Sequence, residues 1–180
     1  MLVERSHSLL LLVDMQERLV PAMAAPDALL ANCRLLLKAA SRLDVPVIAS
    51  EQYPKGLGPT VAGLRELLPP EAVLPKTAFA CGADAELAAR LSRSGRRQIV
   101  VAGIEAHVCV LQTALGLGVA GFTPFVVADA TTSRAPESKA VAIDRLLANR
   151  IEVVTAEMVV FEWLGRAATD EFRELSRLIR

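Results

Sequence analysis

The chain has 180 residues, of which 53% are hydrophobic and 22% are charged, which is enough apolar material for one globular domain over residues 1–180. Its 20 Lys and Arg residues balance its 20 Asp and Glu residues, so no net charge draws it to nucleic acid or an anionic membrane. The 4% aromatic content leaves few rings for stacking on bases. Disordered and nucleic-acid-binding chains are therefore disfavoured, and we expect a small-molecule partner.

The cysteines and the N-terminal residues bear on the compartment. Cys33, Cys81 and Cys109 are too few and too scattered for a disulfide framework, so a reducing cytoplasm is the simplest setting. The apolar stretch at 9–13 is interrupted at Asp14, which argues against a signal peptide. No apolar run is long enough to span a membrane, so we expect a cytoplasmic protein without membrane segments.

Apolar runs and helical periodicity alternate along the whole chain. Strands are predicted at 8–13, 45–50, 72–74, 97–102, 122–128 and 151–154. Helices are predicted at 27–43 (with Asp27 as N-cap), 60–68, 84–94, 108–120, 136–149 and from 155 onward, with a break at Gly165. This order predicts an α/β fold: a doubly wound, six-stranded parallel sheet of Rossmann-type topology in a three-layer α/β/α arrangement.

Three residues with chemical potential stand at predicted strand ends, namely Asp14, Lys76 and Cys109. The carboxyl ends of parallel strands share one edge, where open α/β folds bind their ligands, so these side chains could converge. Cys109 would lie in the first turn of a helix, where the dipole and a nearby lysine favour a thiolate. Asp14 would then carry the proton. Three unrelated polar residues, each solvated or capping a helix, remain an equal alternative on spacing alone.

Other motifs are weaker. Gly116, Gly118 and Gly121 match G-x-G-x-x-G, but they follow a helix and precede a strand, the reverse of a dinucleotide loop. The only histidines are His7 and His107, and neither belongs to a metal-binding spacing, so no metal and no cofactor is expected. His107 is expected at a pocket rim or an interface rather than as a catalytic base.

Three ordered motifs resemble those of the isochorismatase-like cysteine hydrolase superfamily. They are Leu12-Val-Asp14-Met-Gln16, Pro75-Lys76-Thr-Ala-Phe79, and Gly103-Ile-Glu-Ala-His-Val-Cys109 followed by Gln112-Thr113-Ala114. The resemblance implies the six-stranded parallel sheet and a catalytic triad of Asp14, Lys76 and Cys109. It also implies a cis peptide bond between Ile104 and Glu105, with an oxyanion hole formed by the backbone N–H groups of Glu105 and Cys109.

Differences from two subfamilies of this superfamily narrow the choice of the branch that the chain resembles. True isochorismatases carry glycine where this chain has Cys109, and nicotinamidases carry an Asp-x-His metal motif where this chain has Ser50-Glu-Gln-Tyr-Pro-Lys-Gly-Leu-Gly. The chain most resembles the isochorismatase domain-containing branch. The implied activity is hydrolysis of a small amide-type substrate through a thioester, with Tyr53, Phe79 and His107 contacting the substrate. The alternative is a non-catalytic assembly module.

Association is also expected from the apolar content of the chain. The 108–120 helix and the residues around Phe161, Trp163 and Leu164 are predicted to present apolar surface. Such surface commonly marks a symmetric interface, so we expect a homo-oligomer, a dimer or larger.

Overall fold

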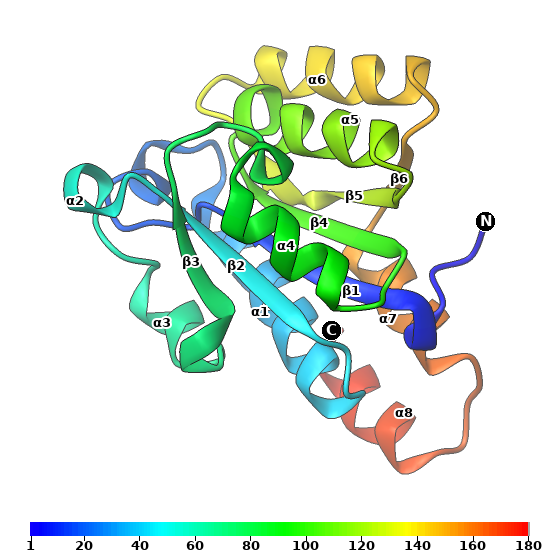
Figure 1. The fold of residues 1–180 in the computed structure, drawn as a ribbon. Coiled ribbons are helices and arrows are strands. Elements are labelled where there is room, and N and C mark those ends of the chain that lie inside the picture. Colours follow the sequence, from blue (N-terminus) through cyan, green and yellow to red (C-terminus); the bar gives the residue numbers. More distant parts are fainter. Residues whose placement is uncertain (180) are drawn as a thin grey trace.

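The computed structural model describes residues 1–179, which form one parallel sheet between two layers of helices (Figure 1). The strand order is β3-β2-β1-β4-β5-β6, and every neighbouring pair is parallel. The strands are β1 (Ser8–Val13), β2 (Val47–Gln52), β3 (Val73–Lys76), β4 (Gln98–Ile104), β5 (Thr123–Thr132) and β6 (Glu152–Val154). This arrangement confirms the predicted fold class, and the winding direction reverses between β1 and β4.

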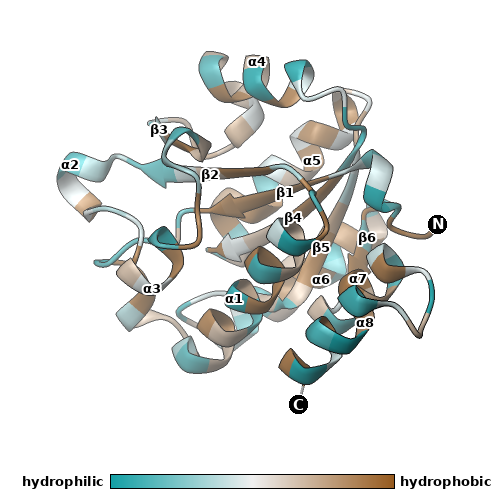
Figure 2. Ribbon diagram, turned by 90° about the horizontal axis from the view of Figure 1, so that it is seen from below, coloured by the Kyte–Doolittle hydropathy of each residue, from teal (hydrophilic) through white to brown (hydrophobic). Residues whose placement is uncertain are grey.

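Two hydrophobic cores lie on opposite faces of the sheet. One face is covered by α1 (Pro26–Arg42), α3 (Ala62–Arg65), α7 (Ala156–Leu164) and α8 (Asp170–Leu175), and the other by α4 (Ala85–Arg93), α5 (Leu111–Val119) and α6 (Pro136–Ala148). The apolar strands run through the centre in Figure 2, and the helices turn their polar sides outward. Every residue of β1 is buried, as expected for a central parallel strand.

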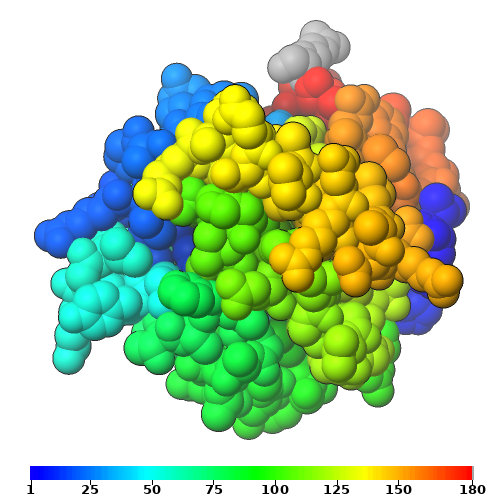
Figure 3. All heavy atoms as spheres, turned by 90° about the horizontal axis from the view of Figure 1, so that it is seen from above, coloured from blue at the N-terminus to red at the C-terminus, as the bar shows by residue number. Residues whose placement is uncertain are grey.

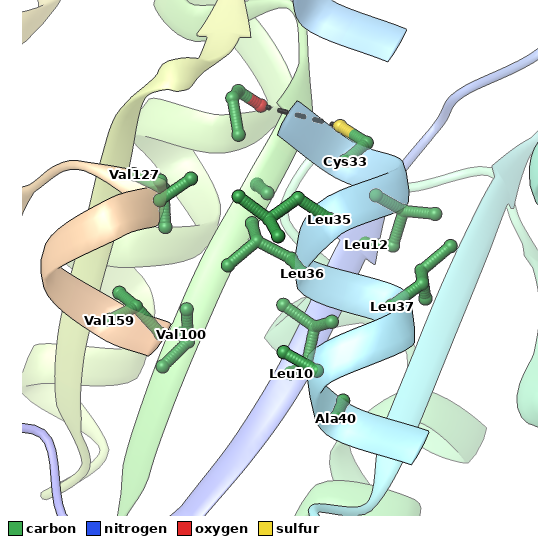
Figure 4. Close-up of a cluster of buried hydrophobic side chains, with 14 of the residues drawn as sticks. Leu10, Leu12, Cys33, Leu35, Leu36, Leu37, Ala40, Val100, Val127 and Val159 are labelled. Atoms are coloured by element: carbon green, nitrogen blue, oxygen red, sulfur yellow. Dashed lines mark hydrogen bonds between the residues drawn. The ribbon is translucent and has the colours of Figure 1, made fainter. Parts of the chain in front are cut away.

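Side chains of β1 alternate between the two cores. Leu10 and Leu12 pack with Leu36 of α1 and Val159 of α7, as Figure 4 shows, whereas Leu11 faces α4, α5 and α6. This alternation follows from the two-residue period of a strand. A strand sandwiched in this way is rigid at its centre, so it holds the residue that follows it in a fixed place.

Several predicted boundaries differ from the structure. The expected 60–68 helix is limited to α3, and a short helix α2 (Pro54–Leu57) forms inside the predicted loop. The helix after β4 begins only at Leu111, because a π-helical turn, Ala106–Val110, precedes it. In this turn the N–H of Val110 donates to the carbonyl of Glu105, 3.2 Å away and five residues earlier. Cys109 therefore lies in a wide turn ahead of α5, and its predicted place in the first α-helical turn is wrong.

Two further expectations are corrected. Asp27 lies inside the first turn of α1, since Ala25 is the N-cap residue and Pro26 begins the helix. Trp163 is only 3% exposed and belongs to the core around α1 and α7, so it adds nothing to an apolar surface. Val119 of α5 is 92% exposed and Phe161 is 42% exposed, so apolar surface remains on both helices.

The face seen in Figure 3 bears α6 across one half of the molecule. The segment around α2 lies at its side, next to the loop that follows β1. Backbone hydrogen bonds join these two segments, from Glu17 to Pro59 at 3.0 Å and from Arg18 to Leu57 at 3.3 Å. Among residues 1–179, no helix has the length and apolar content needed to cross a membrane.

Gly103, near the end of β4, allows the two central strands to approach closely. Its φ is +119°, and a Cβ atom at this position would lie 2.1 Å from the carbonyl oxygen of Val13. Both features restrict the position to glycine. Val13 and Gly103 are register partners, so this contact fixes the residue after β1 against the turn that carries Cys109.

We predict that Gly103→Ala lowers the free energy of unfolding by roughly 3 kcal/mol or more, because the new methyl group meets backbone that cannot move aside. Gly116→Ala is the matched control. Gly116 lies within α5, and a Cβ atom added there would meet no heavy atom within 4 Å. That change should stabilise the protein by roughly 0.5–1 kcal/mol through helix propensity. Urea unfolding measures both, and equal effects would contradict the steric argument.

Candidate active site

Asp14 follows β1 directly and has a left-handed backbone, with φ of 53°. Aspartate tolerates this conformation better than most residues. The backbone N–H of Asp14 donates to the carbonyl of Ser50 at 3.1 Å, and the Asp14 carbonyl accepts from Gln16 at 2.8 Å. The chain therefore turns sharply at the carboxyl edge of the sheet. The Asp14 carboxylate stays buried, with 1% of the side chain exposed.

Lys76 ends β3 and forms a buried ion pair with Asp14. The distance from its Nζ to Oδ2 of Asp14 is 2.7 Å, and the lysine side chain is 0% exposed. The same ammonium donates to Oε1 of Gln52 at 2.5 Å and to the carbonyl of Phe79 at 3.3 Å. A buried cation needs such partners, because its desolvation is costly.

Ser50 and Cys81 complete the surroundings of Asp14, and neither was predicted as part of the site. The Ser50 hydroxyl donates to Oδ1 of Asp14 at 2.7 Å, and the Cys81 thiol donates to that hydroxyl at 3.6 Å. The sequence did hold a signal for Ser50. It is the only polar side chain in the apolar strand predicted at 45–50, and it stands at the edge where Asp14 was expected.

Cys109 reaches this cluster from the opposite half of the sheet. The Asp14 carboxylate and the Lys76 ammonium both influence the pKa of its thiol. Burial, together with the negative charge of Asp14, raises the pKa of Cys109 to about 12. This direction favours the neutral thiol, whereas the sequence led us to expect that Lys76 and a helix terminus stabilise a thiolate.

The basicity of Asp14 is set by opposing influences. Burial raises the pKa of the Asp14 carboxyl above its usual value, whereas Lys76, Ser50 and Cys109 act to lower it. A carboxylate that is partly desolvated holds a proton more readily than one in water. It is therefore suited to exchange a proton with the neighbouring thiol.

The turn between β4 and Cys109 is held by Glu105. The Ile104–Glu105 peptide bond is cis. The Glu105 side chain accepts hydrogen bonds from the backbone N–H and the Nε of Arg134, both at 3.1 Å. Its carbonyl accepts from Val108 at 3.1 Å and from Val110 at 3.2 Å. Both ends of the turn that presents Cys109 are thereby fixed.

The three residues expected to contact a substrate lie in different places. Tyr53 is 55% exposed and lines a shallow pocket of about 370 Å³ together with Lys55, Pro75, Lys76 and Asp84. The Phe79 ring is 53% exposed, while its carbonyl holds Lys76. His107 points elsewhere, since its Nδ1 is 2.9 Å from the hydroxyl of Ser133 beyond the end of β5. The structure therefore associates Tyr53 and Phe79 with Lys76, and His107 with β5.

The positive charge that pairs with the Asp14 carboxylate is the ammonium group of Lys76. Within residues 1–179, no group of three or more His, Cys, Asp or Glu side chains is arranged to hold a metal ion.

Relatives of known sequence share most of this chain. Isochorismatase domain-containing protein 1 of Salmo salar is 39% identical over 167 residues, which cover 93% of this chain but only 59% of that protein. Isochorismatase domain-containing protein 2 of Homo sapiens is 37% identical over 176 residues, covering 96% of this chain and 83% of the relative. The chain thus spans about three fifths of the first relative and most of the second.

Solved structures agree with this comparison. A structure described as MAR1 ribonuclease from Caenorhabditis elegans has a TM-score of 0.92 and 31% identity, covering 99% of this chain and 92% of that chain. The YcaC gene product from Escherichia coli shares the fold, with a TM-score of 0.93 at 24% identity, covering 99% of this chain and 89% of that chain. The family model for the isochorismatase domain matches residues 8–158. With this match and these relatives, the chain belongs to the isochorismatase family, in the branch of isochorismatase domain-containing proteins.

Proposed function

We propose that this chain is a cysteine hydrolase that cleaves a small amide-type substrate through a thioester on Cys109. One observation carries the proposal: the Cys109 thiol is under the electrostatic influence of a buried carboxylate that is bound by Lys76 and Ser50. A nucleophile paired with a base, and a base oriented by a third group, is the arrangement that covalent hydrolysis requires.

In the acylation step, Asp14 accepts the thiol proton while the sulfur of Cys109 attacks the substrate carbonyl carbon. The C–S bond forms, and the carbonyl electrons move to oxygen, where the backbone N–H groups of Glu105 and Cys109 are proposed to stabilise them. The tetrahedral intermediate collapses, the C–N bond breaks, and Asp14 returns the proton to the leaving nitrogen. Lys76 balances the charge of Asp14 throughout.

In the deacylation step, Asp14 accepts a proton from water as the water oxygen attacks the thioester carbon. The C–S bond breaks, and the thiol recovers its proton from Asp14. One amide and one water become one acid and one amine, and the enzyme returns to its starting state. Tyr53 lines a pocket with Lys76, and the Phe79 carbonyl accepts a hydrogen bond from the Lys76 ammonium. The exposed rings of Tyr53 and Phe79 are proposed to contact the substrate.

A non-catalytic assembly module is the alternative, and the buried ion pair weighs against it. Two charges buried together are often no more stabilising than apolar residues of similar size. A purely structural fold would gain little from Lys76 and Asp14 at this depth. Clustered ionisable groups with shifted pKa values are typical of functional sites.

The Caenorhabditis elegans relative is described as a ribonuclease. For this chain we propose a small-molecule substrate instead, because its formal net charge is +0 and only 4% of its residues are aromatic. A screen of small amides, ureides and esters should release ammonia or acid. RNA in the same screen should remain uncut, and RNA cleavage that depends on Cys109 would contradict the proposal of a small-molecule substrate.

The three free cysteines support the proposal of a reducing, cytoplasmic location.

We predict that Cys109→Ser and Cys109→Ala both abolish turnover of the amide found in that screen, while circular dichroism stays native. Asp14→Asn should also abolish turnover, because an amide cannot carry the proton. Its thiol should nevertheless alkylate at least as fast as in the wild type, since Asp14 is one cause of the high pKa of Cys109. Iodoacetamide labelling with peptide mass spectrometry measures this. Full turnover in Cys109→Ala would exclude a covalent mechanism.

A second prediction concerns alkaline pH. Burial raises the pKa values of both Cys109 and Cys33 to about 12 in the folded protein, from an ordinary value of 9.0. Between pH 9 and 12 the thiol loses its proton in the unfolded chain but keeps it in the folded protein, and this favours unfolding. The stability that the neutral thiol contributes is therefore complete below pH 9 and is lost as the pH rises from 9 to 12. In this range each thiol should lower the free energy of unfolding by roughly 1.4 kcal/mol per pH unit.

Urea unfolding across this pH range tests the prediction. Cys109→Ala and Cys33→Ala should each flatten the decline in stability by the amount of one thiol. Cys33 is the matched control, because it is fully buried and lies outside the site. A flatter decline in Cys33→Ala alone would mean that Cys109 is already ionised in the folded protein.

We also propose that the chain forms a homo-oligomer, supported by the exposed apolar side chains of Val119 and Phe161. Light scattering at micromolar concentration should give a multiple of the 19.3 kDa chain mass. A monomer under these conditions would remove the proposal.

A further inference from the structure

All three N–H donors of the Lys76 ammonium have acceptors within the protein. A protonated lysine has three N–H donors. The three acceptors around Nζ are Oδ2 of Asp14 at 2.7 Å, Oε1 of Gln52 at 2.5 Å and the carbonyl of Phe79 at 3.3 Å. The side chain is 0% exposed, so water does not compete for these donors. Every hydrogen of the group is directed at the protein, and none is directed at Cys109 or a substrate.

Gln52 is itself held in one orientation. Its Nε2 donates to the carbonyl of Thr77 at 2.8 Å, which turns Oε1 toward Lys76. Its backbone is held by Gln16, whose Oε1 accepts from the Gln52 N–H at 2.7 Å and whose Nε2 donates to the Gln52 carbonyl at 2.9 Å. Gln16 is completely buried. The amide of Gln52 cannot rotate without breaking one of these bonds.

We propose that Gln52 is a positioning residue that fixes Lys76 as a stationary cation, so that Asp14 alone carries protons at Cys109. This inference rests on the proposed function. With its third donor occupied by Gln52, the ammonium cannot turn toward the sulfur or the leaving group. Lys76 then acts through its charge only, and proton transfer is confined to the Asp14 carboxylate.

The competing explanation gives Gln52 a structural role, in which it only closes the segment between β2 and α2. The two explanations differ in what they predict for the site. A structural role predicts lower stability with unchanged chemistry at Cys109. A positioning role predicts a change at the Lys76 ammonium and in the reactivity of Cys109, even when the fold is intact.

Nuclear magnetic resonance of the full chain, with ¹⁵N-labelled lysine, tests the first consequence. The sequence has four lysines, at 38, 55, 76 and 139. In the wild type, Lys76 should give a slowly exchanging ammonium signal, assigned by its loss in Lys76→Met. The signal should vanish or broaden in Gln52→Met, which keeps the length but lacks the acceptor, and persist in Gln52→Glu, which retains it. Absence of a protected signal in the wild type would overturn the proposal.

Alkylation of Cys109 by iodoacetamide tests the second consequence. Gln52→Met should speed it by roughly tenfold, because the N–H group that loses Gln52 can turn toward the sulfur and stabilise its thiolate with a charge-assisted hydrogen bond. Gln52→Glu should stay within about threefold of the wild type. Gln98→Met is the matched control, because Gln98 is a buried glutamine at the opposite end of the sheet, bonded to the carbonyl of Leu2 at 2.9 Å.

Gln98→Met should lose stability without a change in the alkylation rate. The proposal is overturned if Gln52→Met alkylates no faster than the wild type, or if Gln98→Met speeds alkylation as much. The proposed function is tested separately, by an acyl adduct on Cys109 in the wild type. If the wild type forms an acyl adduct on Cys109 and Gln52→Met alkylates at the wild-type rate, the role of Gln52 is rejected and the proposed hydrolase function is supported.

Discussion

The buried ion pair between Lys76 and Asp14 is the interaction on which the edge of the sheet depends. Two charges out of water are tolerated only when each finds further partners. Ser50 supplies one for Asp14, and Gln52 supplies one for Lys76. The ends of β1, β2 and β3 are thereby connected through side chains as well as through the backbone ladder. Loss of either charge would leave the other one buried without a counterion, which is far more costly than loss of an exposed pair.

The second half of the site comes from β4, across the point where the sheet reverses its winding. Gly103 lets β4 approach the end of β1, and the π-helical turn that follows contains Cys109. Ligand sites of open α/β sheets lie at such reversal points. In the proposed site, Asp14 and Lys76 come from one half of the sheet and Cys109 from the other, so both halves would contribute to the chemistry.

The neutral resting thiol changes how the nucleophile is expected to work. Burial and the charge of Asp14 outweigh Lys76 and keep the proton on the sulfur of Cys109. The proton must then move to Asp14 as the sulfur attacks, so the barrier depends on the position and basicity of the carboxylate. A fixed Lys76 stabilises the ionised carboxylate before the transfer and favours return of the proton afterwards. In the proposed mechanism the sulfur becomes nucleophilic as its proton moves to Asp14, which couples the chemistry to substrate arrival.

The sequence by itself determined the order of strands and helices, because buried parallel strands are continuous apolar runs and helices show a 3.6-residue period. It also placed Asp14, Lys76 and Cys109 near the carboxyl ends of predicted strands, which allowed these side chains to converge at one edge without requiring it. Tertiary structure alone decided the protonation of Cys109, because a pKa depends on burial and on neighbouring charges that no local pattern encodes. It also decided the roles of Ser50 and Gln52, which are ordinary polar residues until β2 is paired between β1 and β3. The π-helical turn at Cys109 arose in the same way, since its five-residue hydrogen bond reflects how β4 meets α5 and not the helix propensity of the turn itself.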